Sequence, residues 1–268
     1  MTKKIGIIGC GWLGMPLAES LLSDGYEVNG SSTSQEKLTL LKEKGINPFQ
    51  ISISESKIKG DIADFLDGLS VVVINIPPKL RGKGPKESYI EKNKLLHKAI
   101  KKSTVKNIIF ASSTAVYGNA KGEVNEQTTP VPTTPSGIQL LQSENLFRND
   151  KELNTTIIRF GGLIGPNRHP VTMLSGRENL NGGNAPVNLI HLDDCIGIIK
   201  KLIEHNRYND VLNAVYPEHP SKIKYYTEQA IKRNLTPPKF TLTGKDLKLI
   251  SSCSVFLIAN YNFHTSIN

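Results

Sequence analysis

The sequence predicts an α/β fold in which a doubly wound parallel sheet carries helices on both faces. Short apolar runs rich in β-branched residues, which are typical of buried strands, alternate along the chain with longer segments of helical periodicity. The first of these runs leads directly into a glycine-rich turn and a helical segment, the arrangement that opens such a sheet. With 268 residues, the chain is long enough for one large α/β domain and a smaller appendage.

Residues 4–23 predict the first strand, turn and helix. The apolar run 5–8 is too short for a helix, whereas Met15 to Ser23 repeats apolar positions at helical spacing. Three glycines between them have the spacing G-x-G-x-x-G, which permits a tight turn, close approach to a pyrophosphate, and close packing of helix on strand. The helix N-terminus then faces the phosphates with free N–H groups. The cofactor-binding residues predicted in this turn are Gly9, Gly11, Trp12, Leu13 and Gly14.

The residues after the second strand indicate which cofactor to expect. An NAD site usually carries an Asp or Glu about 20 residues after the first glycine. Ser31, Ser32 and Thr33 stand there instead, with Lys37 one helical turn further on. Hydroxyls without a carboxylate tolerate a 2′-phosphate, so we predict NADP, with NAD as the alternative. The same hydroxyls could also cap the helix that follows, and Trp12 could either cover the cofactor or pack on the sheet.

Strands and helices continue to alternate up to residue 166. The predicted strands are Tyr26–Gly30, Asn47–Ile51, Val71–Ile76, Val105–Ala111 and Thr155–Phe160, and the predicted helices are Gln35–Lys44, Ile62–Leu66, Glu87–Lys102 and Gly137–Arg148. In an open parallel sheet, ligands bind at the carboxyl ends of the strands. Ile76 and Pro77, which end one of these strands, therefore join the predicted cofactor site.

The pattern loosens after residue 166, which indicates a change of domain. We predict an NAD(P)-binding Rossmann domain over residues 1–166 and a small substrate subdomain over residues 167–268, with residues 187–215 returning in part to the core. The first loop of this second part carries Arg168 and Arg177. These guanidinium groups could dock a phosphate or carboxylate of a substrate, or simply face solvent.

Composition narrows the functional class further. The net charge is +9, but no basic run is interleaved with aromatic residues, so we do not expect a nucleic-acid partner. The three cysteines, Cys10, Cys195 and Cys253, lack disulfide or metal spacing, which is typical of reduced thiols in a cytoplasmic protein without a metal site. No apolar run reaches the roughly 18 residues that span a membrane. We expect a cytoplasmic monomer or homodimer that acts on a small molecule.

Three motifs in order, SSTAVYG, GGLIGPNRHP and VNLIHLDDC, resemble those of extended short-chain dehydrogenases/reductases of the epimerase/dehydratase kind. The resemblance spans nearly the whole chain and implies a Rossmann core, a small C-terminal substrate subdomain, and NAD or NADP at the glycine turn. By motif position, Ser113 and Thr114 fall on the segment that carries the family's active-site Ser/Thr. Tyr117 falls at the wall of the substrate site.

His191 ends a short predicted strand next to the ligand-facing edge, where it could be catalytic or simply hydrogen-bonded. Asp193 and Asp194, which follow it, are expected to cap a helix over Cys195–His205. The candidate catalytic residues are Ser113, Thr114, Tyr117 and His191.

The sequence departs from the family in two places. Ile8 stands where members usually have the first glycine of G-x-x-G-x-x-G, and Ser136 and Leu140 stand at the positions of the family's Tyr-x-x-x-Lys pair. A serine hydroxyl is too weak an acid to replace that tyrosine without an adjacent base. We therefore predict an NAD(P)-binding, epimerase/dehydratase-like oxidoreductase for a small anionic or sugar-like substrate. The alternative is a catalytically inert NADP(H)-binding sensor or partner protein.

Overall fold

The computed structural model describes residues 3–80, 86–242 and 247–268. Its central sheet has seven strands in the order β12-β9-β7-β6-β1-β2-β3, and every neighbouring pair is parallel. These strands are β1 (Lys4–Ile8), β2 (Glu27–Ser32), β3 (Asn47–Gln50), β6 (Val71–Ile74), β7 (Asn107–Ser113), β9 (Asn154–Phe160) and β12 (Val211–Ala214). From β1 the chain winds outward in both directions, so the predicted doubly wound fold is confirmed.

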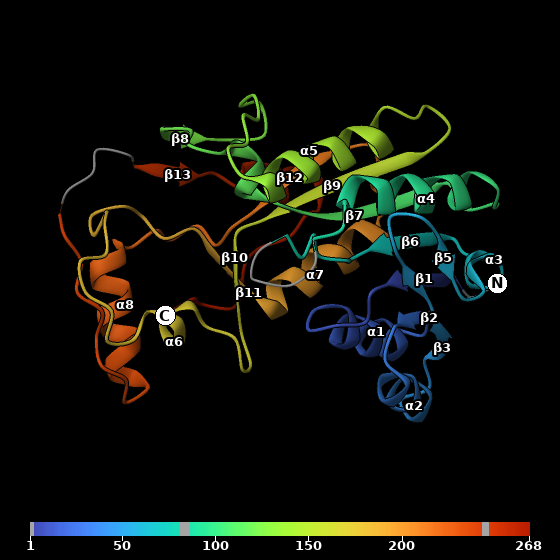
Figure 1. Ribbon diagram of the computed structural model, residues 1–268, viewed down its shortest axis with the longest axis horizontal. Coiled ribbons are helices and arrows are strands. Elements are labelled where there is room, and N and C mark those ends of the chain that lie inside the picture. The colour runs from blue at the N-terminus through green and yellow to red at the C-terminus, as the bar shows by residue number, and fades with distance from the viewer. Residues whose placement is uncertain (1–2, 81–85, 243–246) are drawn as a thin grey trace.

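Helices cover both faces of this sheet. Figure 1 shows α4 and α5 above the sheet and α1 and α2 below it. The helices that pack on the sheet are α1 (Gly14–Ser23), α2 (Gln35–Glu43), α7 (Leu192–Glu204) and the short α9 (Cys253–Ile258) on one face, and α3 (Ile62–Leu66), α4 (Tyr89–Lys101) and α5 (Pro135–Arg148) on the other. Each face has its own hydrophobic cluster.

The central strands are apolar throughout because both of their faces are buried. In β1, Ile7 belongs to the cluster under α1, while its neighbour Ile8 belongs to the cluster under α4. In β6, Val73 and Ile74 divide between the two clusters in the same way. Successive side chains of a strand point to opposite faces, so only a run of apolar residues can satisfy both.

Helix α7 begins three residues earlier than expected. The Nδ1 of His191 accepts a hydrogen bond from the Asp193 N–H at 3.2 Å and so caps the helix. Asp194 lies inside the first turn, where its buried carboxylate accepts the Tyr261 hydroxyl at 2.6 Å. The prediction that Asp193 and Asp194 cap this helix was therefore wrong, because a histidine can supply the same acceptor one position outside the helix.

Smaller elements build a second lobe beside the sheet, to the left in Figure 1. There, α6 (Pro170–Leu174) and α8 (Lys222–Lys232) pack over a third hydrophobic cluster. The short parallel pairs are β10 (Gly162–Ile164) with β11 (Leu189–His191), and β8 (Gly122–Val124) with β13 (Lys248–Ile250). The hairpin β4 (Ser52–Ile53) with β5 (Ile58–Lys59) and the 3₁₀ turn η1 (Thr114–Tyr117) complete the described elements.

Candidate functional site

The surroundings of the three glycines in the first turn differ, so each glycine has a different physical role. Gly9 has φ 102°, a left-handed conformation that favours glycine, and a Cβ there would lie 2.8 Å from the Asn75 carbonyl oxygen. A Cβ on Gly14 would overlap the Gly9 carbonyl oxygen. By contrast, a Cβ on Gly11 would have no heavy atom within 4 Å. The fold therefore needs Gly9 and Gly14, while Gly11 leaves open space in front of the turn.

That space belongs to a pocket of about 440 Å³ at the carboxyl edge of the sheet. Eight of the predicted cofactor residues line it: Gly9, Gly11, Ser31, Ser32, Thr33, Lys37, Ile76 and Pro77. Sequence reasoning missed other parts of its wall. These are Asn75, directly after β6, and residues from the region of β4 and the start of α4, among them Ile51, Ile53, Tyr89 and Lys92. No local pattern could identify these residues, because only the packing of separate segments brings them to the turn.

The hydroxyls at the end of β2 and just after it have separate roles. Ser31 is buried, and its Oγ accepts the Gly9 N–H at 3.0 Å, so this side chain holds the glycine turn in place. Ser32 Oγ accepts the Ser34 N–H at 3.1 Å. Thr33 and Lys37 are exposed at the pocket wall. Two of the four predicted ribose-reading side chains therefore also hold local structure, and two face outward.

Trp12 and Leu13 lie outside the residues that line this pocket. Leu13 is buried in the hydrophobic cluster under α1. The Trp12 indole N–H donates to the Pro166 carbonyl at 2.9 Å, and the Arg168 guanidinium lies 4.8 Å from the centre of the indole ring. Trp12 therefore links the glycine turn to the loop after β10, and it also packs against the hydrophobic cluster under α1.

His191 lies at this same junction. A Cβ on Gly165 would be 3.1 Å from the Trp12 ring and 3.5 Å from His191 Nε2, so the three residues meet closely. The imidazole is about one-fifth exposed, and Nδ1 lies 3.3 Å from an Asp193 carboxylate oxygen. Nε2 has no hydrogen-bond partner among the described residues, which leaves this nitrogen available to a bound molecule.

The SSTAVYG segment places its side chains in two environments. Ser113 and Thr114 are half-buried at the end of β7, and Ser113 Oγ accepts the Ala115 N–H at 3.2 Å. Tyr117 is fully buried instead: its hydroxyl donates to Asn213 Oδ1 at 2.9 Å and accepts from Arg159 at 2.9 Å. Burial raises the pKa of Tyr117. This hydroxyl lies in the core, away from any surface that a substrate could contact.

A buried charge network lies beneath this segment. Arg159 on β9 pairs with Glu144 on α5 at 2.7 Å, and the Ser112 hydroxyl donates to the same carboxylate. Both charged side chains are at most 4% exposed. Because each charge satisfies the other, the network holds α5 against β7 and β9.

Ser136 and Leu140 lie near the start of α5, next to the SSTAVYG segment. Ser136 is 9% exposed, and Leu140 is 5% exposed within the hydrophobic cluster under α4. The helix is capped by Thr134, whose Oγ1 accepts the Gly137 N–H at 3.1 Å. A Cβ on Gly137 would lie 2.8 Å from the Ala115 carbonyl oxygen, so the start of α5 packs directly on η1. Neither Ser136 nor Leu140 carries a group that titrates near neutral pH.

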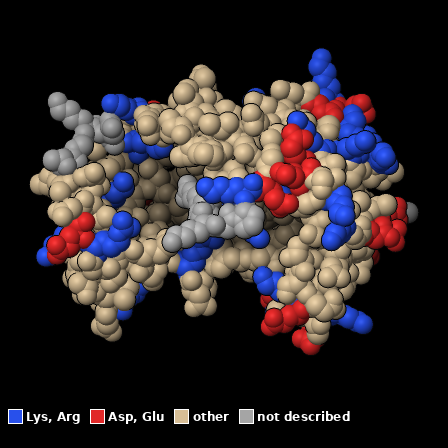
Figure 2. Space-filling view, in the orientation of Figure 1, with Lys and Arg blue, Asp and Glu red and all other residues tan. Residues whose placement is uncertain are grey.

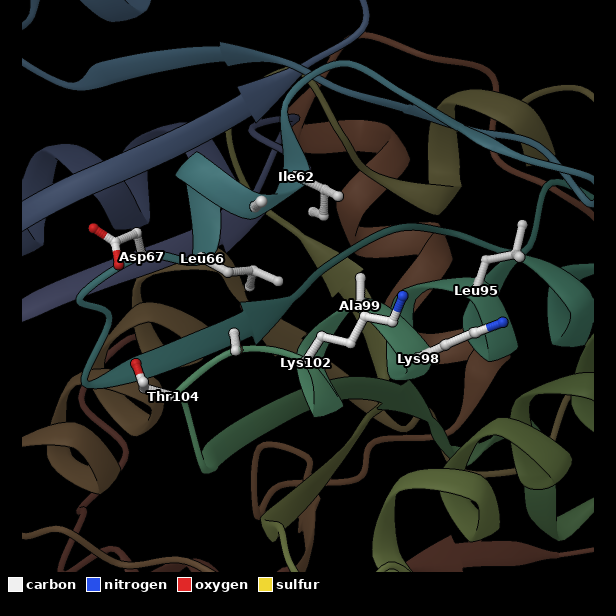
Figure 3. A pocket seen from close by; sticks show the side chains of 10 residues that line it. Ile62, Leu66, Asp67, Leu95, Lys98, Ala99, Lys102 and Thr104 are labelled. Atoms are coloured by element: carbon white, nitrogen blue, oxygen red, sulfur yellow. The ribbon is translucent and has the colours of Figure 1, made fainter.

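A pocket of about 470 Å³ lies between α3 and α4 (Figure 3). Leu66, Leu95 and Ala99 form its apolar floor, and Lys98 and Lys102 stand at its rim. The segments that line it lead into the amino ends of β6 and β7. It therefore lies at the edge of the sheet opposite to the one where dinucleotides bind.

Among the described residues, no group of three or more His, Cys, Asp or Glu side chains could hold a metal ion. Burial raises the pKa of Cys10, next to the glycine turn, to about 12, so this thiol is not a nucleophile. None of the helices in the described part of the chain combines the length and apolar character needed to cross a membrane.

Similar proteins were found at the level of sequence. The model of the family described as NAD(P)H-binding matches residues 9–190. Protein YeeZ of Escherichia coli K12 is 36% identical over 239 residues, which cover 89% of this chain and 86% of that protein. A Bacillus subtilis protein named as an uncharacterized UDP-glucose epimerase, YtcB, is 26% identical over 185 residues, or 62% of this chain and 58% of that protein.

Solved structures have the same fold. A UDP-glucuronic acid 4-epimerase from Bacillus cereus in complex with NAD superimposes with a TM-score of 0.80 at 21% identity, covering 98% of this chain and 92% of that one. A UDP-glucose 4-epimerase from Thermotoga maritima gives 0.81 at 17% identity, covering 99% and 95%. The predicted resemblance to epimerase-like dehydrogenases/reductases is thus confirmed, as is a nicotinamide dinucleotide as the class of cofactor. The chain belongs to the NAD(P)H-binding family.

Proposed function

We propose that this protein is an NAD(P)-linked, epimerase/dehydratase-like oxidoreductase that acts on a small anionic or sugar-like molecule. The observation that carries the proposal is the open space in front of Gly11, within a pocket at the carboxyl edge of the parallel sheet. The names of the relatives support the substrate class, since one is called a UDP-glucose epimerase and a solved neighbour was crystallised with UDP-glucose.

For the cofactor we propose NADP, with NAD as the alternative. Thr33 and Lys37 are the exposed side chains at the part of the pocket where the adenine ribose would lie. The pocket is lined by one carboxylate among the described residues, Glu87, and Lys92 neutralises it in an ion pair. A 2′-phosphate would therefore meet hydroxyls and a lysine without repulsion.

For the chemistry, we propose roles for three of the candidate side chains. When bound, the nicotinamide supplies hydride exchange at its C4 carbon. Ser113 and Thr114, at the carboxyl end of β7, would hold the substrate oxygen. His191 would move the proton through its open Nε2, because Nδ1 accepts the Asp193 N–H and the ring proton therefore lies on Nε2. Tyr117 would act only by positioning Arg159, because its hydroxyl is buried.

A second function, an inert NADP(H)-binding sensor or partner protein, is favoured by Ser136 and Leu140. If these residues occupy the positions of the family's Tyr and Lys, the protein lacks the acid that normally protonates the substrate oxygen. Dinucleotide binding does not need that acid. The two functions therefore predict the same binding and different turnover.

Isotope exchange separates them. NADPH and NADH labelled with deuterium at C4 would be incubated with the protein and a keto-sugar nucleotide, whose carbonyl can accept the hydride. UDP-glucose, UDP-glucuronic acid and simple sugar phosphates, deuterated at the alcohol carbons that can give up hydride, would be incubated in turn with NADP⁺ and NAD⁺. Transfer of label in either direction between dinucleotide and substrate supports the enzyme. Tight dinucleotide binding without exchange over the whole panel supports the sensor. Failure to bind either dinucleotide would overturn both proposals.

A further inference from the structure

A separate pocket of about 350 Å³ lies where the second lobe meets the core. Figure 2 shows the surface hollowed between the lobe that carries α8 and the region of β8 and β13, with basic side chains at the rim. Four separate segments line the pocket: residues 118–120 directly after η1, residues 185–189 leading into β11, Lys222 and Tyr226 from α8, and Lys248 from β13.

The charged residues that line this pocket are both lysines. No carboxylate is among its lining residues, and neither Lys222 nor Lys248 forms an ion pair within the described parts of the chain. Burial, together with the positive charge of Lys222, lowers the pKa of Lys248. Two ammonium groups that repel each other in a partly enclosed space would be stabilised by an anion between them.

Both lysines are held by the same segment of backbone. The Lys222 N–H donates to the Ala185 carbonyl at 2.9 Å. The Asn188 side chain binds β13, since its amide donates to the Lys248 carbonyl at 2.8 Å and its oxygen accepts the Ile250 N–H at 2.8 Å. The Lys248 ammonium also donates to the Gly118 carbonyl at 2.7 Å. These bonds fix the backbone at both lysines and the ammonium of Lys248, so less ordering remains for a ligand to impose.

We propose that Lys222 and Lys248 form a binding site for a phosphate group of the substrate. A phosphate carries close to two negative charges at neutral pH and three acceptor oxygens, which matches two ammonium groups with several free donors. The pocket wall at Gly118 directly follows η1, so a bound phosphate would lie one short turn from Ser113 and Thr114. This inference rests on the proposed function, because it assigns the anionic end of the substrate to a place beside the proposed reaction site.

The test measures binding of inorganic pyrophosphate by calorimetry at constant ionic strength, with the protein saturated by NADPH so that the glycine turn is occupied. The variant Lys222→Gln/Lys248→Gln should weaken pyrophosphate binding at least about tenfold, the usual effect of losing hydrogen bonds to a charged group. The control Lys42→Gln/Lys232→Gln removes the same charge from exposed lysines of α2 and α8 and should change the affinity less than about twofold. Lys222→Gln alone keeps the Lys248 bond to Gly118 and covers the case in which the double variant does not fold.

Equal pyrophosphate affinity in the parent, in Lys222→Gln and in Lys222→Gln/Lys248→Gln would refute the proposed site. Malonate binding as tightly as pyrophosphate would overturn the choice of phosphate over carboxylate. Dinucleotide affinity is measured separately in the same variants and should stay unchanged. If the parent binds no NADPH, the proposed function fails, and the comparison of lysine variants, repeated without dinucleotide, still decides whether this pocket binds phosphate.

Discussion

At the scale of single residues, the glycine turn separates what the fold requires from what a ligand requires. Gly9 and Gly14 have backbone neighbours that leave no room for a side chain, whereas Gly11 faces open space. Ser31 combines both roles, because it lines the pocket while its hydroxyl accepts the Gly9 N–H. Substitutions at neighbouring glycines should therefore affect folding and binding independently.

The variant Gly11→Val should fold normally and lose dinucleotide binding. Its side chain would meet no protein atom but would occupy the approach of the pyrophosphate. NADPH fluorescence titration together with a thermal melt checks both halves of the prediction. Gly14→Ala is the matched control, since its methyl group would overlap the Gly9 carbonyl and lower Tm. Unchanged NADPH affinity in folded Gly11→Val would refute the assignment of the turn.

NADP(H) should bind more tightly than NAD(H), by a modest factor. Among the described residues, those near the adenine ribose offer Thr33 and Lys37 but no arginine for a bidentate bond to the 2′-phosphate. Lys37→Gln should reduce the NADPH affinity by about fivefold or less, as expected for an exposed charge pair, and leave NADH unaffected. The dissociation constants of both dinucleotides, measured at one salt concentration, test this prediction. A clear preference for NADH would contradict it.

At the scale of secondary-structure elements, histidine side chains start two helices. His191 caps α7 and His169 caps α6. His169 Nδ1 accepts the Val171 N–H, so the proton is on Nε2, which donates to Tyr225 on α8, and Tyr225 in turn donates to the Ile267 carbonyl. A neutral imidazole therefore connects α6, α8 and the last residues of the chain.

Stability should fall as the pH is lowered from about 6.5 to about 4, partly through His169. Burial, with a smaller effect of Arg233, lowers the pKa of His169 from 6.5 to about 4. In that window the unfolded chain binds a proton that the folded protein excludes. The contribution of neutral His169 to the free energy of unfolding, at most about 3 kcal/mol, is therefore fully present above pH 6.5 and is lost as the pH falls towards 4.

Urea unfolding at several pH values measures this effect. His169→Asn retains an acceptor for the Val171 N–H and removes the titrating group, so its stability should depend less on pH than that of the parent. Identical pH profiles for the two proteins would show that His169 does not carry the dependence.

At the scale of the whole molecule, the reaction site that we propose lies between the core and the second lobe. Trp12 hydrogen-bonds across this junction to Pro166, and Lys248 does so to Gly118. The start of α5 packs on η1 at the same place. Whether the assembled site turns over substrate therefore depends on which side chains α5 presents there.

The double variant Ser136→Tyr/Leu140→Lys should raise carbonyl reduction if the rest of the site is intact. The tyrosine would restore an acid worth about 10²–10⁴-fold in rate, and the lysine would lower its pKa. Single-turnover hydride transfer measures the gain. Ser136→Phe/Leu140→Met is a control of similar size without the acid and should show no gain. Some loss of Tm is expected because Leu140 belongs to the core.

A parent enzyme already as fast as ordinary members of its family would contradict this account. Parent activity that persists unchanged in the variant His191→Ala would contradict it as well. In that case another acid, or a different position for the start of α5, must operate.

The amino-acid sequence by itself determined the order of strands and helices, the glycine turn and the class of cofactor. These depend on local patterns: apolar runs of strand length, helical periodicity, and glycine spacing within a few residues. Gly11 and Lys37 could be assigned to the pocket because both lie within a few residues of strand ends.

Only the tertiary structure decided which side chains are available. Tyr117 could not be recognised as buried from its motif, because its partner Asn213 is 96 residues away. Lys222 and Lys248 share a pocket only because residues 185–189 hold both. The physical reason is that a side chain's burial and partners depend on the packing of distant segments, which no local periodicity encodes.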